Sequence, residues 1–137
     1  MIKILTATVA VVALTATARA GNTLPQSMTG TWCTDLDLSN GNHHAYYRQE
    51  RRDCEDAGPT IRPNGYSIIW DECVFQKVTQ DATGYWAVTK CEAVSEGPDR
   101  YPIGISWVNK EHYRINKDGY LVMDETELKK TCKVPCS

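Results

Sequence analysis

Long apolar runs are scarce in this chain, and their scarcity limits the classes to which the protein can belong. The one clear run covers residues 4–14, between Lys3 and the small-residue pattern Ala18-Arg19-Ala20. A positive start, a short apolar run and a small-x-small site are the pattern of an export signal. We predict that residues 1–20 are a signal peptide and that the mature protein is periplasmic or secreted. No later run approaches the roughly 20 residues that cross a bilayer, so no membrane association is expected after cleavage.

Basic residues are also in short supply. Once residues 1–20 are removed, 13 Lys and Arg stand against 17 Asp and Glu, a net charge of −4. Nucleic acids and anionic membrane surfaces select basic proteins. The composition therefore predicts neither as a partner.

The one basic cluster contains Arg51 and Arg52, and acidic residues follow it directly at 53, 55 and 56. Such mixed clusters are usually solvated loops whose charges pair with one another. The functional alternative is a bidentate anion site made by Arg51 or Arg52 beside Tyr46 or Tyr47.

Motifs for catalysis and metal binding are missing. The chain has no G-x-S-x-G and no H-E-x-x-H, and its three histidines are His43, His44 and His112. Neighbouring histidines in a strand point to opposite faces, so His43 and His44 cannot share an ion. The Asp/Ser/Asn alternation at 35–41 resembles a calcium loop, but turn chemistry explains it better, because the required Glu is absent. We expect no catalytic residues, no metal and no cofactor.

Phenylalanine occurs once, at Phe75, whereas there are four Trp and seven Tyr. Trp and Tyr combine an apolar body with a polar group, which suits half-buried sheet faces and binding surfaces. The candidate binding tryptophans are Trp32, Trp70, Trp86 and Trp107.

What the chain does have is an even number of cysteines. All six follow the export signal, at positions 33, 54, 73, 91, 132 and 136. Outside the cytoplasm such a set predicts a disulfide framework. The 117 residues after position 20 suit one domain, with a polar arm at 21–27 and a single β domain at 28–137.

Strands are predicted at 28–35, 44–49, 66–70, 73–79, 85–91, 103–108, 112–116, 120–124 and 127–132, with a short one at 60–62. Asn64-Gly65 and Asp118-Gly119 are hairpin signals, and residues 109–111 are interpreted as a further turn. No helical period follows the signal. We expect an all-β fold, a small antiparallel meander that closes into a barrel or a sandwich.

The segment 73–91 allows a sharper geometric prediction. If residues 80–84 form its loop, Thr79 faces Tyr85, and antiparallel pairing places Cys73 opposite Cys91. The same register pairs Phe75 with Thr89 and Val78 with Trp86. A Cys73–Cys91 bridge would stabilise the fold by about 3 kcal/mol, because it restricts the unfolded chain.

The other bridges are less constrained. We favour Cys33–Cys54 and Cys132–Cys136, because short loops close most readily. In a closed barrel the first and last strands are neighbours, so Cys33 could instead reach Cys132 or Cys136.

Gly30-x-Trp32 near the start of the first strand resembles the opening of lipocalin-like barrels, in which the Trp plugs one barrel end. It is also similar to Inh-type metalloprotease inhibitors, whose N-terminal arm enters the protease cleft; residues 21–27 would be that arm here. A closer resemblance is to uncharacterised secreted bacterial proteins that open with G-x-W-C. Their later strands are like residues 68–73 and 85–91, and that likeness implies a fold without an activity.

Two functional hypotheses follow. The first is a secreted or periplasmic, non-enzymatic binding module, inhibitor-like, whose partner is an extracytoplasmic protein. The alternative is a lipocalin-like carrier whose pocket is lined by some of the four tryptophans. A cavity below about 300 Å³ would count against the carrier. The sequence makes no prediction of oligomeric state.

Overall fold

The computed structural model describes residues 20–49, 53–95 and 102–131. These residues form nine strands and one short 3₁₀ helix. In chain order they are β1 (Ala20–Gly21), η1 (Gln26–Met28), β2 (Gly30–Thr34), β3 (His43–Arg48), β4 (Ala57–Arg62), β5 (Gly65–Ile68), β6 (Asp71–Gln80), β7 (Tyr85–Ala93), β8 (Ser106–Ile115) and β9 (Leu121–Thr131). The all-β prediction is confirmed. Within the described ranges there is no helix of the length and apolarity needed to span a membrane.

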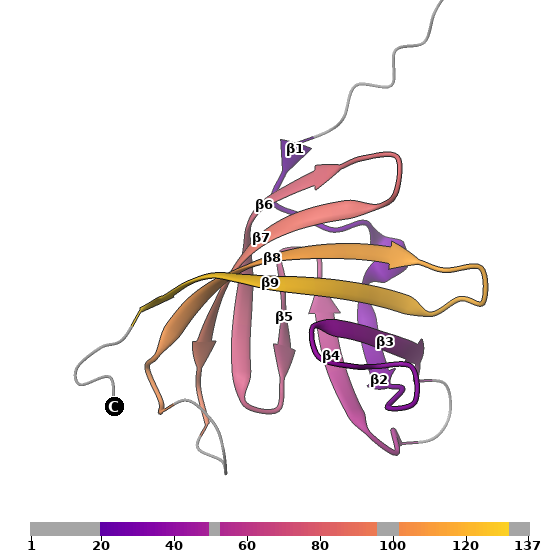
Figure 1. Ribbon diagram of the computed structural model, residues 1–137, viewed down its shortest axis with the longest axis horizontal. Coiled ribbons are helices and arrows are strands. Elements are labelled where there is room, and N and C mark those ends of the chain that lie inside the picture. Colours follow the sequence, from indigo (N-terminus) through magenta and orange to yellow (C-terminus); the bar gives the residue numbers. More distant parts are fainter. Residues whose placement is uncertain (1–19, 50–52, 96–101, 132–137) are drawn as a thin grey trace, which may run out of the picture.

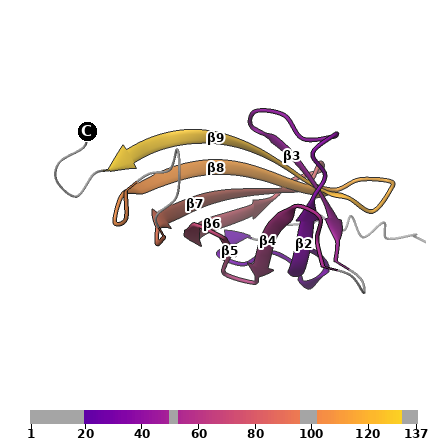
Figure 2. The same cartoon turned by 90° about the horizontal axis from the view of Figure 1, so that it is seen from below.

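Strands β2 to β9 close into an eight-stranded antiparallel barrel. The order around it is β3-β2-β4-β5-β6-β7-β8-β9, and β9 pairs with β3. Figure 2 shows the sheet curving round through β9, β8, β7, β6 and β5. The barrel therefore departs from a simple meander at its start, because β4 returns to the other side of β2. The last strand meets β3 rather than β2, so Cys33 is one strand away from β9.

The β6–β7 hairpin confirms half of the predicted register. Cys73 pairs with Cys91 and Phe75 with Thr89 as expected, but a bulge after Phe75 shifts the remaining pairs by one residue. Val78 therefore faces Ala87 instead of Trp86, and Gln80 rather than Thr79 faces Tyr85. A bulge adds a residue to one strand only, so counting back from the loop could not reveal it.

Strands β8 and β9 correct a second prediction. The expected turn at 109–111 does not exist, because residues 106–115 form one continuous strand and pair along its length with β9. Figure 1 shows these two long strands side by side, joined by the turn that contains Asp118-Gly119. That turn was predicted correctly, and Gly119 has a φ of +83°. The polar residues at 109–111 suggested a turn. Within the strand, however, Asn109 and Glu111 point into the barrel and are buried.

The hairpin at Asn64-Gly65 forms one residue earlier than predicted. Arg62 pairs with Gly65, so Pro63 and Asn64 make the turn and Gly65 belongs to β5. A Cβ atom at Gly65 would lie 2.2 Å from the backbone oxygen of Cys73. Glycine is needed here for the close approach of β6, rather than for a positive φ.

Both disulfides in the described residues were predicted: Cys33–Cys54 and Cys73–Cys91. The pair Cys132–Cys136 lies outside those residues. Cys73 and Cys91 face the barrel interior, whereas Cys33 fastens Cys54, in the segment before β4, to β2. Two disulfides are consistent with an extracytoplasmic protein.

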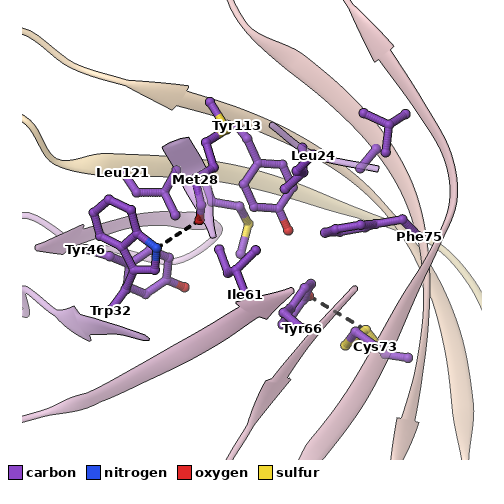
Figure 3. Close-up of a cluster of buried hydrophobic side chains, with 14 of the residues drawn as sticks. Leu24, Met28, Trp32, Tyr46, Ile61, Tyr66, Cys73, Phe75, Tyr113 and Leu121 are labelled. Carbon is purple, nitrogen blue, oxygen red and sulfur yellow. Dashed lines mark hydrogen bonds between the residues drawn. A yellow bond between two sulfur atoms is a disulfide. The ribbon is translucent and has the colours of Figure 1, made fainter. Parts of the chain in front are cut away.

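Apolar side chains fill one end of the barrel, which we call the closed half. It lies around the start of β2 and the ends of β3 and β4, and its main members are Leu24, Met28, Trp32, Tyr46, Ile61 and Leu121. Figure 3 shows Trp32 beside Met28, whose carbonyl accepts the indole N–H at 3.0 Å. Trp32 is 1% exposed and belongs to the buried cluster at this end of the barrel.

The segment at 21–28 covers the closed half. Leu24 is buried, and its N–H donates to the carbonyl of Pro63 at 2.8 Å. The Arg48 guanidinium stacks 4.4 Å from the Trp32 ring centroid and donates to the carbonyls of Ser27 and Thr29. The expected polar arm is therefore packed onto the barrel.

Candidate functional site: a cavity in the barrel

The opposite end of the barrel, which we call the hollow half, contains a partly enclosed cavity of about 560 Å³. This volume exceeds the limit of about 300 Å³ set above for a carrier. The described residues that line it come from both sides of the barrel: Asn42, His44, Tyr66, Ile68, Asp71, Cys73, Cys91, Trp107, Asn109, Glu125 and Glu127.

Strand geometry explains why these residues meet. Side chains at every second position of a strand point to the same face. Trp107 and Asn109 therefore share the inner face of β8, and Glu125 and Glu127 share that of β9. Antiparallel pairing brings the start of β8 and the later part of β9 to the same end of the barrel.

The Cys73–Cys91 disulfide and Tyr66 form an apolar part of the wall. Both cysteines are 1% exposed, and the Tyr66 hydroxyl lies 3.7 Å from Cys91 Sγ. Figure 3 shows Tyr66 directed toward this disulfide and away from the group around Trp32. The bridge that fixes the β6–β7 register thus also shapes the cavity.

A buried carboxylate lies behind the wall, at Glu111. Tyr66 donates to Glu111 Oε1 at 2.6 Å, while Thr89 and Tyr113 donate to Oε2 at 2.7 and 2.6 Å. Glu111 has no exposed surface. Because Tyr66 both lines the cavity and binds Glu111, it connects the cavity to the barrel interior.

The electrostatics of this interior are set by burial and by two acidic residues. Burial raises the pKa of Glu111, although the three hydroxyl donors act in the opposite direction, and the charge of Glu125 adds to the increase. Burial and the charges of Glu125 and Glu111 also raise the pKa of Tyr46. The pKa of Tyr66 and of Tyr113 is raised in the same way, by burial first and by Glu111 next. Negative potential therefore extends through the interior.

Glu125 is held in place by polar neighbours. His44 Nε2 lies 3.3 Å from Glu125 Oε1, and the Asn109 amide donates to Oε2 at 3.5 Å. The backbone N–H of Glu125 donates to the carbonyl of Asn42 at 2.9 Å. These contacts join β9 to the segment before β3 at the cavity.

The structure separates the four tryptophans, some of which were predicted to line one pocket. Trp107 lines the cavity, and it is the only one of the four among the described lining residues. Trp32 is buried in the closed half, and Trp70 lies in the turn between β5 and β6. Trp86 is 38% exposed on the outer face of β7, where its indole N–H donates to Asp81 and Lys110 lies over its ring.

The predicted anion site lies only partly within the described residues. Tyr46 is buried and stacks with His44, whereas its neighbour Tyr47 is exposed on the other face of β3. Arg51 and Arg52 lie outside the described residues, so that prediction stays open.

The histidines behave as strand geometry predicted. His43 Nδ1 lies 2.5 Å from Asp124, while His44 contacts Glu125 on the opposite face of β9. The calcium-like segment is a turn, because Asp35 Oδ1 accepts from the N–H groups of Asp37 and Leu38. Among the described residues no cluster of three or more His, Cys, Asp or Glu could hold a metal ion.

Sequence reasoning missed Glu111, Asn109 and the carboxylates of the cavity. The available signal was the period-two series Trp107, Asn109, Glu111, Tyr113, which places alternating aromatic and polar residues on one strand face. Such a series predicts a polar barrel interior once residues 106–115 are recognised as one strand.

Comparison of the chain with protein-family models, with curated proteins and with solved structures finds no significant match in any of the three.

Proposed function

We propose that the protein is a secreted or periplasmic, non-enzymatic binding protein that holds a small ligand in the cavity of the hollow half. The observation that carries the proposal is the cavity of about 560 Å³. Ligand pockets of roughly 300–1,000 Å³ with apolar walls and a few fixed polar groups are typical of small-molecule sites. Of the two functions expected from the sequence, the carrier is the better supported.

The inhibitor-like alternative depends on a free arm at residues 21–27. Leu24 is buried and hydrogen-bonded to Pro63, and Arg48 binds the carbonyl of Ser27. A segment held in this way would have to leave the barrel, and uncover Trp32, before it could enter a protease cleft. We therefore base the proposed function on the cavity and not on the segment at 21–27.

The test is native mass spectrometry of the oxidised full chain, purified from its own host. We expect a co-purifying small molecule in the wild type. Ile68→Trp should exclude it by filling the cavity, whereas Val74→Trp makes a comparable change on the exposed face of β6 and should retain it.

A bare mass for the wild type, or a ligand that stays bound in both variants, would overturn the proposal. Circular dichroism of both variants establishes that they fold.

A further inference from the structure

The cavity carries more information than its size, because its lining selects the charge of a ligand. Three of its described lining residues are acidic: Asp71 on β6, and Glu125 and Glu127 on β9. None of the described lining residues is Lys or Arg. Strands β7 and β8 lie between β6 and β9, so the carboxylates reach the cavity from separate sides of the barrel.

Another carboxyl group, that of Glu111, lies behind the wall. Its carboxylate is linked to the lining through the hydroxyl of Tyr66, at 2.6 Å. The charge of Glu125 reaches several interior groups, since it contributes to the raised pKa of Tyr46, Tyr66 and Glu111. Low-dielectric walls focus such a potential, so an anionic ligand would be repelled and a cation attracted.

The other walls suit the body of an organic cation. Trp107 and Tyr66 present aromatic rings to the cavity, and Ile68 and the disulfide supply apolar surface. Aromatic ring faces attract ammonium groups, with the largest effect in desolvated sites. Asn42 and Asn109 provide side-chain carbonyl acceptors in the same lining.

We infer that the ligand is a small organic cation, an amine whose ammonium group lies among the carboxylates and whose apolar part packs against Trp107 and Ile68. This inference rests on the proposed function, since it names the chemical class of the ligand for the same cavity. Binding needs no chemical step and no cofactor.

The experiment compares three probes of similar shape and different charge by isothermal titration calorimetry: phenethylamine, phenethyl alcohol and phenylacetate. With the oxidised wild-type protein at pH 7, we expect phenethylamine to bind about tenfold more tightly than the alcohol. Phenylacetate should bind most weakly of the three.

Two variants make matched changes in charge. Glu125→Gln removes a carboxylate of the cavity and should weaken phenethylamine binding by about tenfold, with little effect on the alcohol. Glu92→Gln removes a carboxylate from the exposed face of β7 and should leave the affinity unchanged.

Equal binding of the three probes, or tightest binding of phenylacetate, would overturn the inference. If Ile68→Trp abolishes the binding of these probes, the cavity is still a ligand site and the proposed function stands. Failure of phenethylamine to bind at millimolar concentration also overturns the inference, and the mass of the host-purified protein then decides separately whether the cavity is a ligand site.

Discussion

The two halves of the barrel share strands β3 and β9 but are filled in different ways. In the closed half Trp32 and Leu121 belong to one buried apolar cluster with Leu24 and Met28, which the segment at 21–28 contributes. In the hollow half carboxylates, amides and one disulfide surround a cavity. Apolar groups gain stability by packing together, whereas charged groups need water, partners or a ligand. The closed half is thus suited to holding the fold, and the hollow half to binding.

Replacement of one tryptophan in each half tests this difference most directly. Trp32→Ala should reduce the free energy of unfolding by about 3–5 kcal/mol, because a fully buried ring leaves a cavity. Trp107→Ala should cost less, about 1–3 kcal/mol, since its ring already borders empty space and has fewer packing partners to lose. Urea denaturation of both variants measures the two values. Equal losses would show that the halves contribute alike to stability.

The two disulfides offer a second comparison. Their sequence separations, 21 for Cys33–Cys54 and 18 for Cys73–Cys91, are similar, so replacing either pair with alanines should cost about 3 kcal/mol. The two variants should lose local stability in different parts of the barrel. Hydrogen exchange should rise around residues 53–57 without the first bridge, and in β6 and β7 beside the cavity without the second. Loss of protection around the cavity in both variants would contradict the division into halves.

Glu111 should make stability depend on pH. The folded protein raises the pKa of Glu111, so it holds the proton more tightly than the unfolded chain does. The stability that this proton provides is present below the unfolded pKa of about 4, and it is lost as pH rises through the higher folded pKa.

Glu111→Gln should remove this dependence, so the stability of the variant relative to the wild type increases between about pH 4 and pH 7. Tyr113→Phe removes a hydrogen bond that lowers the pKa of Glu111. In this variant the decrease in stability with rising pH should therefore extend to higher pH than in the wild type. Urea midpoints measured across that range test both variants. An unchanged pH profile in Glu111→Gln would show that Glu111 is not the titrating group.

Asp81, on the exposed β6–β7 turn, should give the opposite and smallest effect. Hydrogen bonds from the hydroxyl and N–H of Thr83, with Trp86 and Gly84 adding to them, lower the pKa of Asp81 to about 2. The stability that the ionised Asp81 carboxylate provides is therefore present above the unfolded pKa, and it is lost as pH falls from about 4 to 2. Asp81→Asn should destabilise the protein slightly at pH 7, and the difference from the wild type should vanish near pH 2. Thermal unfolding followed by circular dichroism measures the difference, and a constant gap across this range would refute the assignment.

Several elements were predictable because they depend on neighbours in the chain. The Asp118-Gly119 turn, for example, needs a residue that tolerates positive φ. The predicted pairing of Cys73 with Cys91 is also found, but in the structure it depends on the bulge after Phe75, because Gln80 rather than Thr79 faces Tyr85. The bulge after Phe75 was not predictable, because the spacing of residues does not show where one strand gains a residue. The same holds for the one-residue shift of the Pro63-Asn64 turn, which the close approach of Gly65 to β6 explains.

The sequence by itself determined the all-β class and favoured the two disulfides of the described residues, because alternation, turn chemistry and short loops are local properties. Only the tertiary structure decided what the interior contains. Asn109 and Glu111 are polar, so in the sequence they resemble a turn, yet barrel closure directs them inward to Tyr66, Thr89 and Glu125. A polar residue can face inward only where distant strands supply its partners, and closure of the barrel is what brings those strands together.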